Sequence, residues 1–184
     1  PILAEFNIKI AADSTNAQLY YMRAKYYMRI QKLSLANIDA EMAVALDTLK
    51  GEYYLLLADI YLYRNESRKT NAVLTKYLSI TPSDKMANFK MAQLMLYVKH
   101  YDEGLKFANA VYNTDKKDLN ANFLMGMLYK EKCDTAHALD YFRNCIDIKP
   151  DYFEAYDQLG YIQKARNKPD AMDYFNSALK IRPQ

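Results

Sequence analysis

One 34-residue frame fits this chain five times in succession, with units that begin at Ala17, Gly51, Lys85, Leu119 and Phe153. A fixed period of this size is typical of repeat architectures, in which each unit is one supersecondary element that buries its apolar face against its neighbours. The sequence therefore predicts a tandem array.

Small side chains recur at two positions of the frame. The eighth position holds Ala24, Ala58, Ala92, Gly126 and Gly160. The twentieth position holds Ala36, Thr70, Gly104, Ala138 and, after a one-residue contraction of the turn near Asn167, Ala171. Larger apolar residues dominate the eleventh and twenty-fourth positions, as expected of core sites. We therefore expect two helices in each unit that cross closely where small residues face one another.

Proline follows the second half of several units, at Pro82, Pro150 and Pro183. Because proline lacks an amide donor and disfavours helical geometry in the residue before it, these positions predict helix ends. First helices are expected near residues 18–30, 52–64, 86–98, 120–132 and 154–165, and second helices near residues 35–47, 68–80, 102–114, 136–148 and 170–181. With only four Gly and five Pro in 184 residues, the chain is also too poor in turn formers for an all-β fold. The expected fold class is all-α.

The repeated residues resemble the tetratricopeptide repeat, whose pattern sets a large aromatic, Leu-Gly, Tyr, Ala, Phe and Pro at fixed offsets. The last unit matches it with Tyr156, Leu159, Gly160, Ala171, Phe175, Ala178 and Pro183, and the unit before it with Gly126, Tyr129, Ala138, Phe142 and Pro150. The pentatricopeptide repeat, a similar hairpin that reads RNA, favours a 35-residue period, so the spacing argues against it.

The resemblance implies a right-handed α-solenoid of antiparallel helix pairs that forms one continuous domain. Its five units would span residues 17–50, 51–84, 85–118, 119–152 and 153–184. Residues 1–16 fit the frame as the second helix of a truncated leading repeat, with Phe6 at the twenty-fourth position.

Both ends of the chain lack the polar capping helix that terminal repeats normally need. We therefore expect a segment of a longer protein, or open ends that pair with another chain, end to end with a second copy included. Because the first residue is Pro, the absence of a signal peptide does not assign a compartment, and cytoplasm and periplasm both stay open. No apolar run is long enough for a membrane span, since the best candidate, Tyr53 to Tyr63, is short and contains Asp59.

Few residues suit catalysis or metal binding. Cys133 falls at a turn and Cys145 within the next helix, roughly 14 Å apart along that helix, so free thiols are expected. Cys133 and His137 lie four residues apart, but a metal site needs three or four ligands, and a turn residue with a solvated histidine is the favoured interpretation. No phosphate-binding loop or nucleophile with a partner base is visible. We predict no enzyme and no cofactor.

Positive charge clusters on the first helix of the first unit, at Arg23, Lys25, Arg29 and Lys32, and is spread over the third unit, at Lys85, Lys90, Lys99 and Lys106. The chain has no block of one charge sign, and its formal net charge is only +3. A solvated helix face explains the clusters better than a polyanion site. We therefore predict no nucleic-acid partner.

The resemblance places a binding groove on the inner face of the solenoid, lined by one stripe of each first helix. The candidate groove residues are Tyr21, Lys25, Leu55, Asp59, Leu62, Tyr63, Phe89, Lys90, Gln93, Leu96, Tyr97, Phe123 and Met127. An apolar and aromatic lining of this kind suits an amphipathic helix or an extended apolar peptide of a partner protein. The alternative is that the aromatic residues only pack the scaffold.

Some members of this family hold the acidic C-termini of chaperones in a clamp of Lys, Asn and Arg. Starting from the first unit, the clamp positions read Tyr21, Lys25, Leu56, Met86 and Lys90. Only Lys90 comes close to the clamp pattern, so we predict no carboxylate clamp.

The sequence thus favours a non-catalytic protein-interaction module. Two alternatives remain open: a structural scaffold that stacks through its terminal helices, and a regulatory segment of a larger enzyme or sensor.

Overall fold

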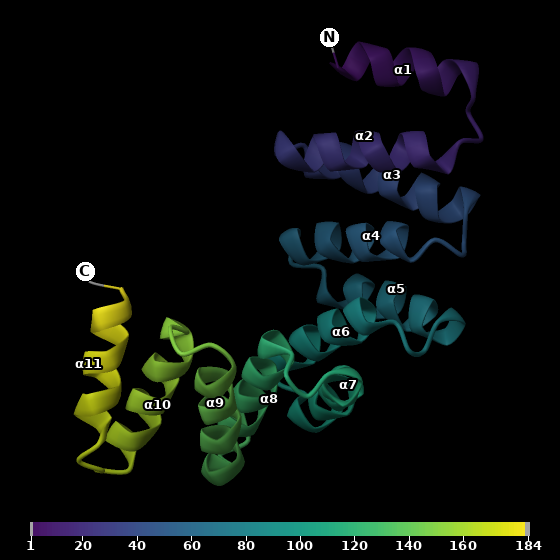
Figure 1. Ribbon diagram of the computed structural model, residues 1–184. Coiled ribbons are helices and arrows are strands. Elements are labelled where there is room, and N and C mark those ends of the chain that lie inside the picture. Colours follow the sequence, from purple (N-terminus) through teal and green to yellow (C-terminus); the bar gives the residue numbers. More distant parts are fainter. Residues whose placement is uncertain (1, 183–184) are drawn as a thin grey trace. The chain divides into compact units, whose positions relative to one another are not determined.

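The computed structural model describes residues 2–182, which contain eleven α-helices and no strand (Figure 1). Their bounds are α1 (Ile2–Ala12), α2 (Ala17–Arg29), α3 (Leu33–Leu46), α4 (Gly51–Tyr63), α5 (Ser67–Ile80), α6 (Lys85–Tyr97), α7 (Tyr101–Thr114), α8 (Leu119–Glu131), α9 (Thr135–Ile148), α10 (Phe153–Ala165) and α11 (Ala171–Ile181). The all-α prediction is confirmed.

The chain divides into two compact units, one up to Ala87 and one from Asn88 onward, with the division inside α6. In the first unit, α2 pairs with α3 and α4 with α5, while α3 packs on α4. In the second unit, α8 pairs with α9 and α10 with α11, while α7 packs on α8 and α9 on α10. Each pair forms an antiparallel hairpin (Figure 1). That the repeats form one continuous domain stays a prediction.

The helix bounds lie within one or two residues of those expected from the frame. Helices α5 and α9 each end two residues before a proline, Pro82 and Pro150. This is the effect expected of proline on the residues before it. The third proline used as a helix stop, Pro183, lies outside the described residues.

Paired helices approach closely where the small residues stand. Ala24, Ala36, Ala58, Thr70, Ala92 and Ala138 are fully buried. At Gly126, a Cβ would lie 2.7 Å from Cε1 of Phe142, and at Gly160 it would lie 2.6 Å from Cε1 of Phe175. Real Cβ atoms do not approach other atoms this closely, so these two glycines make room for the phenylalanine rings.

The turn inside each hairpin contains a residue in the left-handed region. These residues are Gln31, Asn65, Lys99, Cys133 and Asn167, with φ between 54° and 65°. All five stand at the fifteenth position of the frame, 34 residues apart. In the first hairpin, the next amide, Lys32 N–H, donates to the Tyr27 carbonyl, which is the bond of a Schellman helix end. The repeat period is therefore visible in the backbone as well as in the side chains.

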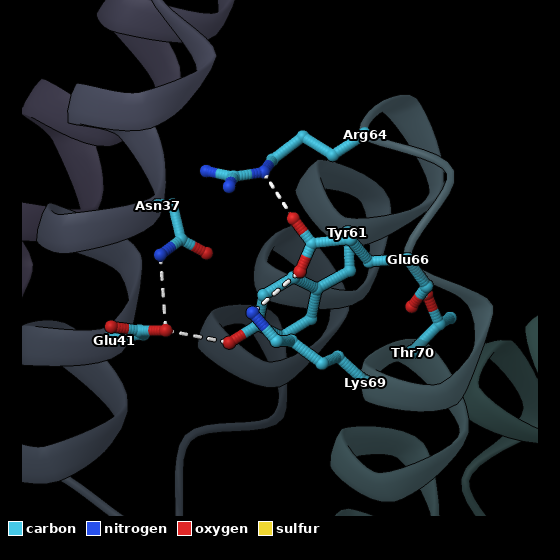
Figure 2. A network of polar contacts seen from close by, with 7 residues as sticks. All are labelled: Asn37, Glu41, Tyr61, Arg64, Glu66, Lys69 and Thr70. Atoms are coloured by element: carbon cyan, nitrogen blue, oxygen red, sulfur yellow. Dashed lines mark hydrogen bonds and ion pairs between the residues drawn. The ribbon is translucent and has the colours of Figure 1, made fainter.

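A network of polar contacts ties three helices of the first unit together (Figure 2). The Tyr61 hydroxyl of α4 donates to Glu41 Oε1 of α3 at 2.6 Å, and burial raises the pKa of Tyr61. Glu66, at the start of α5, accepts from Arg64 Nε at 2.6 Å and pairs with Lys69 Nζ at 2.6 Å. The network fixes how α4 lies between α3 and α5.

Candidate binding surface

A hollow lies on the second unit, between α6 and α8. It has a volume of about 500 Å³. Its lining residues are Phe89, Gln93, Leu96 and Tyr97 from α6 and Asn120, Phe123, Leu124 and Met127 from α8. We call it the α6–α8 pocket.

Helical spacing brings these residues together. The four from α6 are separated by four, three and one residues, and the four from α8 by three, one and three. Side chains at such spacings share one face of a helix, so each helix contributes one stripe. The pocket is the place where the two stripes face each other.

Aromatic packing holds the pocket wall in position. The Phe123 ring contacts the Phe142 ring at a centroid distance of 5.5 Å and the Tyr152 ring, edge to face, also at 5.5 Å. Such geometries are favourable for aromatic pairs. Phe123 is half-buried, so one part of its ring is fixed by the core and another part is open to a ligand.

The polar groups of the pocket are the amides of Gln93 and Asn120 and the hydroxyl of Tyr97. None of the eight lining residues is an acid, a lysine or an arginine. Tyr97 is 65% exposed and stands at the rim. An apolar lining with amide groups that both donate and accept hydrogen bonds suits an uncharged apolar segment with a peptide backbone.

Six of the candidate groove residues line this pocket: Phe89, Gln93, Leu96, Tyr97, Phe123 and Met127. Lys90, on the same helix, is not among the lining residues. The sequence prediction missed Asn120 and Leu124. Asn120 stands at the second position of its unit, which belongs to the inner stripe in the resembling family, so the frame could have found it. Leu124 is 95% buried and reads from the sequence as core.

The candidate residues of the first unit lie on α2 and α4. Asp59, Leu62 and Tyr63 line a hollow of about 340 Å³ at the end of α4. Lys25 lines a pocket beside α1. Tyr21 packs on the Tyr53 ring at a centroid distance of 5.1 Å.

Leu55, the remaining candidate, is half-buried on α4. The thirteen candidates therefore lie on α2, α4, α6 and α8. That they line one groove stays a prediction.

The cysteines are free, with Cys133 exposed and Cys145 fully buried. Burial raises the pKa of the Cys145 thiol to about 12. The Asp134 side chain accepts from the His137 amide and contacts His137 Nδ1 at 2.8 Å, which holds the pKa of Asp134 below its usual range. Cys133 therefore lies in a turn, and His137 lies in the first turn of α9, which Asp134 caps.

The structure offers no metal cluster within residues 2–182, where no three His, Cys, Asp or Glu residues are grouped to hold an ion. The helices of the same stretch are also all too short or too polar to cross a membrane.

The sequence profile of the tetratricopeptide repeat matches residues 119–152, which form the hairpin of α8 and α9. The same frame and the same turn geometry recur in the other hairpins. The described helices have the fold of a tetratricopeptide repeat array.

Solved structures of tetratricopeptide repeat proteins show the same fold. MamA from Desulfovibrio magneticus RS-1, from residue 41 to its end, is 17% identical, with a TM-score of 0.83 over 90% of this chain and 94% of that one. YrrB, described as a tetratricopeptide repeat protein with an unusual peptide-binding site, is 17% identical, with a TM-score of 0.78 over 97% and 93%. A chain of the Cut9–Hcn1 hetero-tetramer is 16% identical, with a TM-score of 0.76 over 96% and 36%. At these identities the likeness shows the fold alone.

Curated relatives are also similar in sequence. The DnaJ homolog subfamily C member 7 homolog of Schizosaccharomyces pombe is 23% identical over 205 residues, which cover 96% of this chain and 43% of the relative. RANBP2-like and GRIP domain-containing protein 8 of Homo sapiens is 28% identical over 90 residues, which cover 45% of this chain and 5% of the relative. The chain thus spans less than half the length of these relatives. Its fold is that of a scaffold for protein–protein interaction, generally without catalytic activity.

Proposed function

We propose that this chain binds a segment of a partner protein, an amphipathic helix or an extended apolar peptide, in the α6–α8 pocket, and that it does so without catalysis. The observation that supports the proposal most strongly is the apolar lining, in which two half-buried phenylalanines, Phe89 and Phe123, face a hollow of about 500 Å³.

A hollow of this volume falls within the usual range of ligand sites, about 300–1,000 Å³. Aromatic side chains dominate the energetics of protein interfaces, especially where the ring is held by packing behind it. Phe123 meets this description because Phe142 and Tyr152 support it. The peptide-binding site of YrrB supports the proposal by showing that the same fold can hold a peptide.

The amides of Gln93 and Asn120 give the pocket a means of recognising a backbone. Each amide can donate to a peptide carbonyl and accept from a peptide N–H. Both side chains are exposed. The pocket contains no cation that would bury a carboxylate, so we propose an apolar internal segment as ligand in place of an acidic C-terminus.

Affinity capture from the native cell extract tests this function. The test variant is Gln93→Ala with Tyr97→Ala, because both side chains are exposed and their truncation leaves the core intact. The matched control is Tyr63→Ala, since Tyr63 stands at the same position of its repeat and is 68% exposed. Circular dichroism checks the fold of each variant first.

We expect a protein that the wild type retains and the Gln93→Ala/Tyr97→Ala variant releases. Retention by the control places the contact on α6 and α8, whereas loss in both variants indicates a groove that also includes α4. Equal retention by all three proteins contradicts a binding role for the α6–α8 pocket.

A further inference from the structure

We propose that the outer face of α3 binds a second copy of this chain, so that two α3 helices pack antiparallel along one apolar seam. The seam consists of Leu35, Ile38, Met42 and Ala45, and we call it the α3 seam. None of its residues lines the α6–α8 pocket, so this inference does not depend on the proposed function.

The α3 seam is exposed although it is apolar. Leu35 is 41% exposed, Ile38 58% and Met42 41%, and Ala45 is exposed as well. Elsewhere on its circumference α3 packs on α2 and α4. The residues buried there include Ala36, Ala40, Ala43 and Val44. A helix that is apolar on two sides lacks the polar face that is typical of a surface helix.

Repeat packing does not require these apolar residues. Leu35, Ile38 and Met42 stand at the nineteenth, twenty-second and twenty-sixth positions of the frame. The same positions of the next three units carry mostly polar or charged side chains: Lys69, Ala72 and Lys76 on α5, Glu103, Lys106 and Ala110 on α7, and His137, Asp140 and Asn144 on α9. The apolar seam is therefore a property of α3 and not of the repeat.

Neighbouring repeats do not cover this outer face. Within the second unit, α9 packs on α8 before it and on α10 after it, and His137 and Asp140 of α9 are exposed. On α5, Lys69 and Lys76 are exposed in the same way. Stacking of repeats therefore leaves this face open, and the exposure of the α3 seam does not depend on how many repeats precede it.

The spacing of the α3 seam identifies a helix as its occupant. The four residues are separated by three, four and three positions, which is the pattern of a coiled-coil seam and is narrower than the stripe of a core-facing helix. Side chains at this spacing interlock with the same row on a facing helix. A second copy of the chain supplies such a row, and pairing of identical faces about a two-fold axis is the most common form of self-association.

The sizes of the four side chains favour an antiparallel pair. With the two-fold axis between Ile38 and Met42, Ile38 of one copy faces Met42 of the other, and Leu35 faces Ala45. Each large residue at the ends of the seam then meets a small one, as close packing requires. A parallel pair would set Ala45 against Ala45 and leave a gap at one end.

Charges at the ends of α3 fit the same arrangement. Lys32, at the N-terminal end, is exposed and makes no ion pair in the described part of the chain. Antiparallel pairing brings it beside the C-terminal end of the other α3, where the helix carries partial negative charge and Asp47 follows. This contact occurs twice in the pair. The two Glu41 carboxylates, which border the seam, oppose association by a smaller amount.

The size of the seam predicts a weak dimer. A helix of 14 residues is about 21 Å long. Pairing two such helices buries less than the roughly 800 Å² per partner that a standard stable interface buries. We therefore expect a dissociation constant on the order of 100 µM.

Sedimentation equilibrium of the full chain, from about 5 to about 500 µM, tests this inference. Ile38→Lys should weaken the association at least about tenfold, because it places a charge in an apolar contact. The matched control is Ala72→Lys, which changes the same frame position on α5 and should have no effect. Ile38 and Ala72 are both exposed, so the fold should be retained, and circular dichroism checks it.

Cross-linking of single cysteines tests the antiparallel arrangement. The background variant Cys133→Ser removes the exposed native thiol. Leu35→Cys and Ala45→Cys are made separately in this background, mixed in equal amounts and treated with a short bis-maleimide. We expect linked dimers that contain one chain of each kind, because position 35 faces position 45 across the axis. Links mainly between like positions would contradict the antiparallel pair.

A chain that stays monomeric at the highest concentration overturns the inference, as does association that Ile38→Lys leaves unchanged. Association that is lost in the Gln93→Ala/Tyr97→Ala variant overturns it as well, because that variant alters the α6–α8 pocket and not the α3 seam. Benzoylphenylalanine at position 38 provides the last arm. It should link two copies of the chain in the native cell extract, and links only to a different protein would show that protein to be the occupant, against a second copy.

Discussion

In two hairpins, a glycine on one helix makes room for a phenylalanine ring on the other. Gly126 stands against Phe142 and Gly160 against Phe175, with no space for a Cβ. In the earlier units, Ala at the eighth position accompanies Ala40, Leu74 or Ala108 at the twenty-fourth. The sequence shows both sets of residues, but the pairing of Gly with Phe becomes clear only from the distances.

This pairing predicts a strong coupling between two substitutions. Gly126→Ala should lower the free energy of unfolding by about 1–3 kcal/mol, because the new methyl group forces the Phe142 ring out of its place. The smaller side chain of Phe142→Leu should relieve this clash, so the double variant should lose less than the sum of the two single variants. Urea unfolding of the four proteins measures the coupling, and additive effects would contradict the account.

The two cysteines should differ in reactivity and in their effect on stability. Iodoacetamide at pH 8 should modify the exposed Cys133 and leave the buried Cys145 unmodified until the chain unfolds, as peptide mass spectrometry would show. Modification of both thiols at similar rates in the folded chain would contradict the burial of Cys145.

The pKa of Cys145, about 12, is higher than that of an unfolded thiol, about 8.5. The folded state therefore binds the proton more tightly, and this contribution is complete below about pH 8.5 and is lost as the pH rises toward 12. Between pH 8.5 and 10.5 the loss should be roughly 2 kcal/mol, and Cys145→Ala should remove it. Urea unfolding of both proteins across this range measures the difference, and identical pH dependence would argue against it.

At the scale of helices and turns, the most regular feature is one that the sequence pattern did not reveal. The helix bounds were predictable because prolines and small residues recur at fixed positions. The left-handed residues of the turns were not, since none of the five is glycine, the usual residue at that place. Residues as different as Gln31, Lys99 and Cys133 adopt the same conformation at this position.

The strain at these turns can be tested at Lys99, which has φ of 65°. A residue with a Cβ pays about 1–2 kcal/mol in this conformation, partly offset by the greater freedom of glycine in the unfolded chain. Lys99→Gly should therefore raise the free energy of unfolding by about 0.5–1 kcal/mol. Lys106→Gly, inside α7, should lower it by about 1 kcal/mol. Thermal unfolding of the two variants and the wild type measures these changes in stability. A lower stability of Lys99→Gly than of the wild type would contradict the strain argument.

At the scale of the whole molecule, the fold followed from the sequence more completely than the binding surface did. A period of 34 residues determines which residues pack inside each hairpin. Six of the eight residues of the α6–α8 pocket were predictable because helical spacing and the repeat frame place them on one stripe. The shape of the pocket also depends on the packing of Phe142 and Tyr152 against the Phe123 ring. The repeat spacing does not predict these ring contacts.

The open pocket beside α1 shows the same limit. Its chemistry depends on which cations already have partners: Arg23 is paired with Asp39, whereas Lys25 and Arg29 rest on tyrosine rings. These pairings are a matter of three-dimensional contact and are not visible as a sequence pattern.

Photocrosslinking tests whether the α6–α8 pocket contacts a partner protein. A benzoylphenylalanine replaces Tyr97 at the pocket rim or, as control, the exposed Lys106 on α7. We expect irradiation in the native cell extract to link a defined protein to position 97 and not to position 106, through an apolar segment identified by mass spectrometry. No adduct at position 97, or the same adducts at both positions, would contradict it.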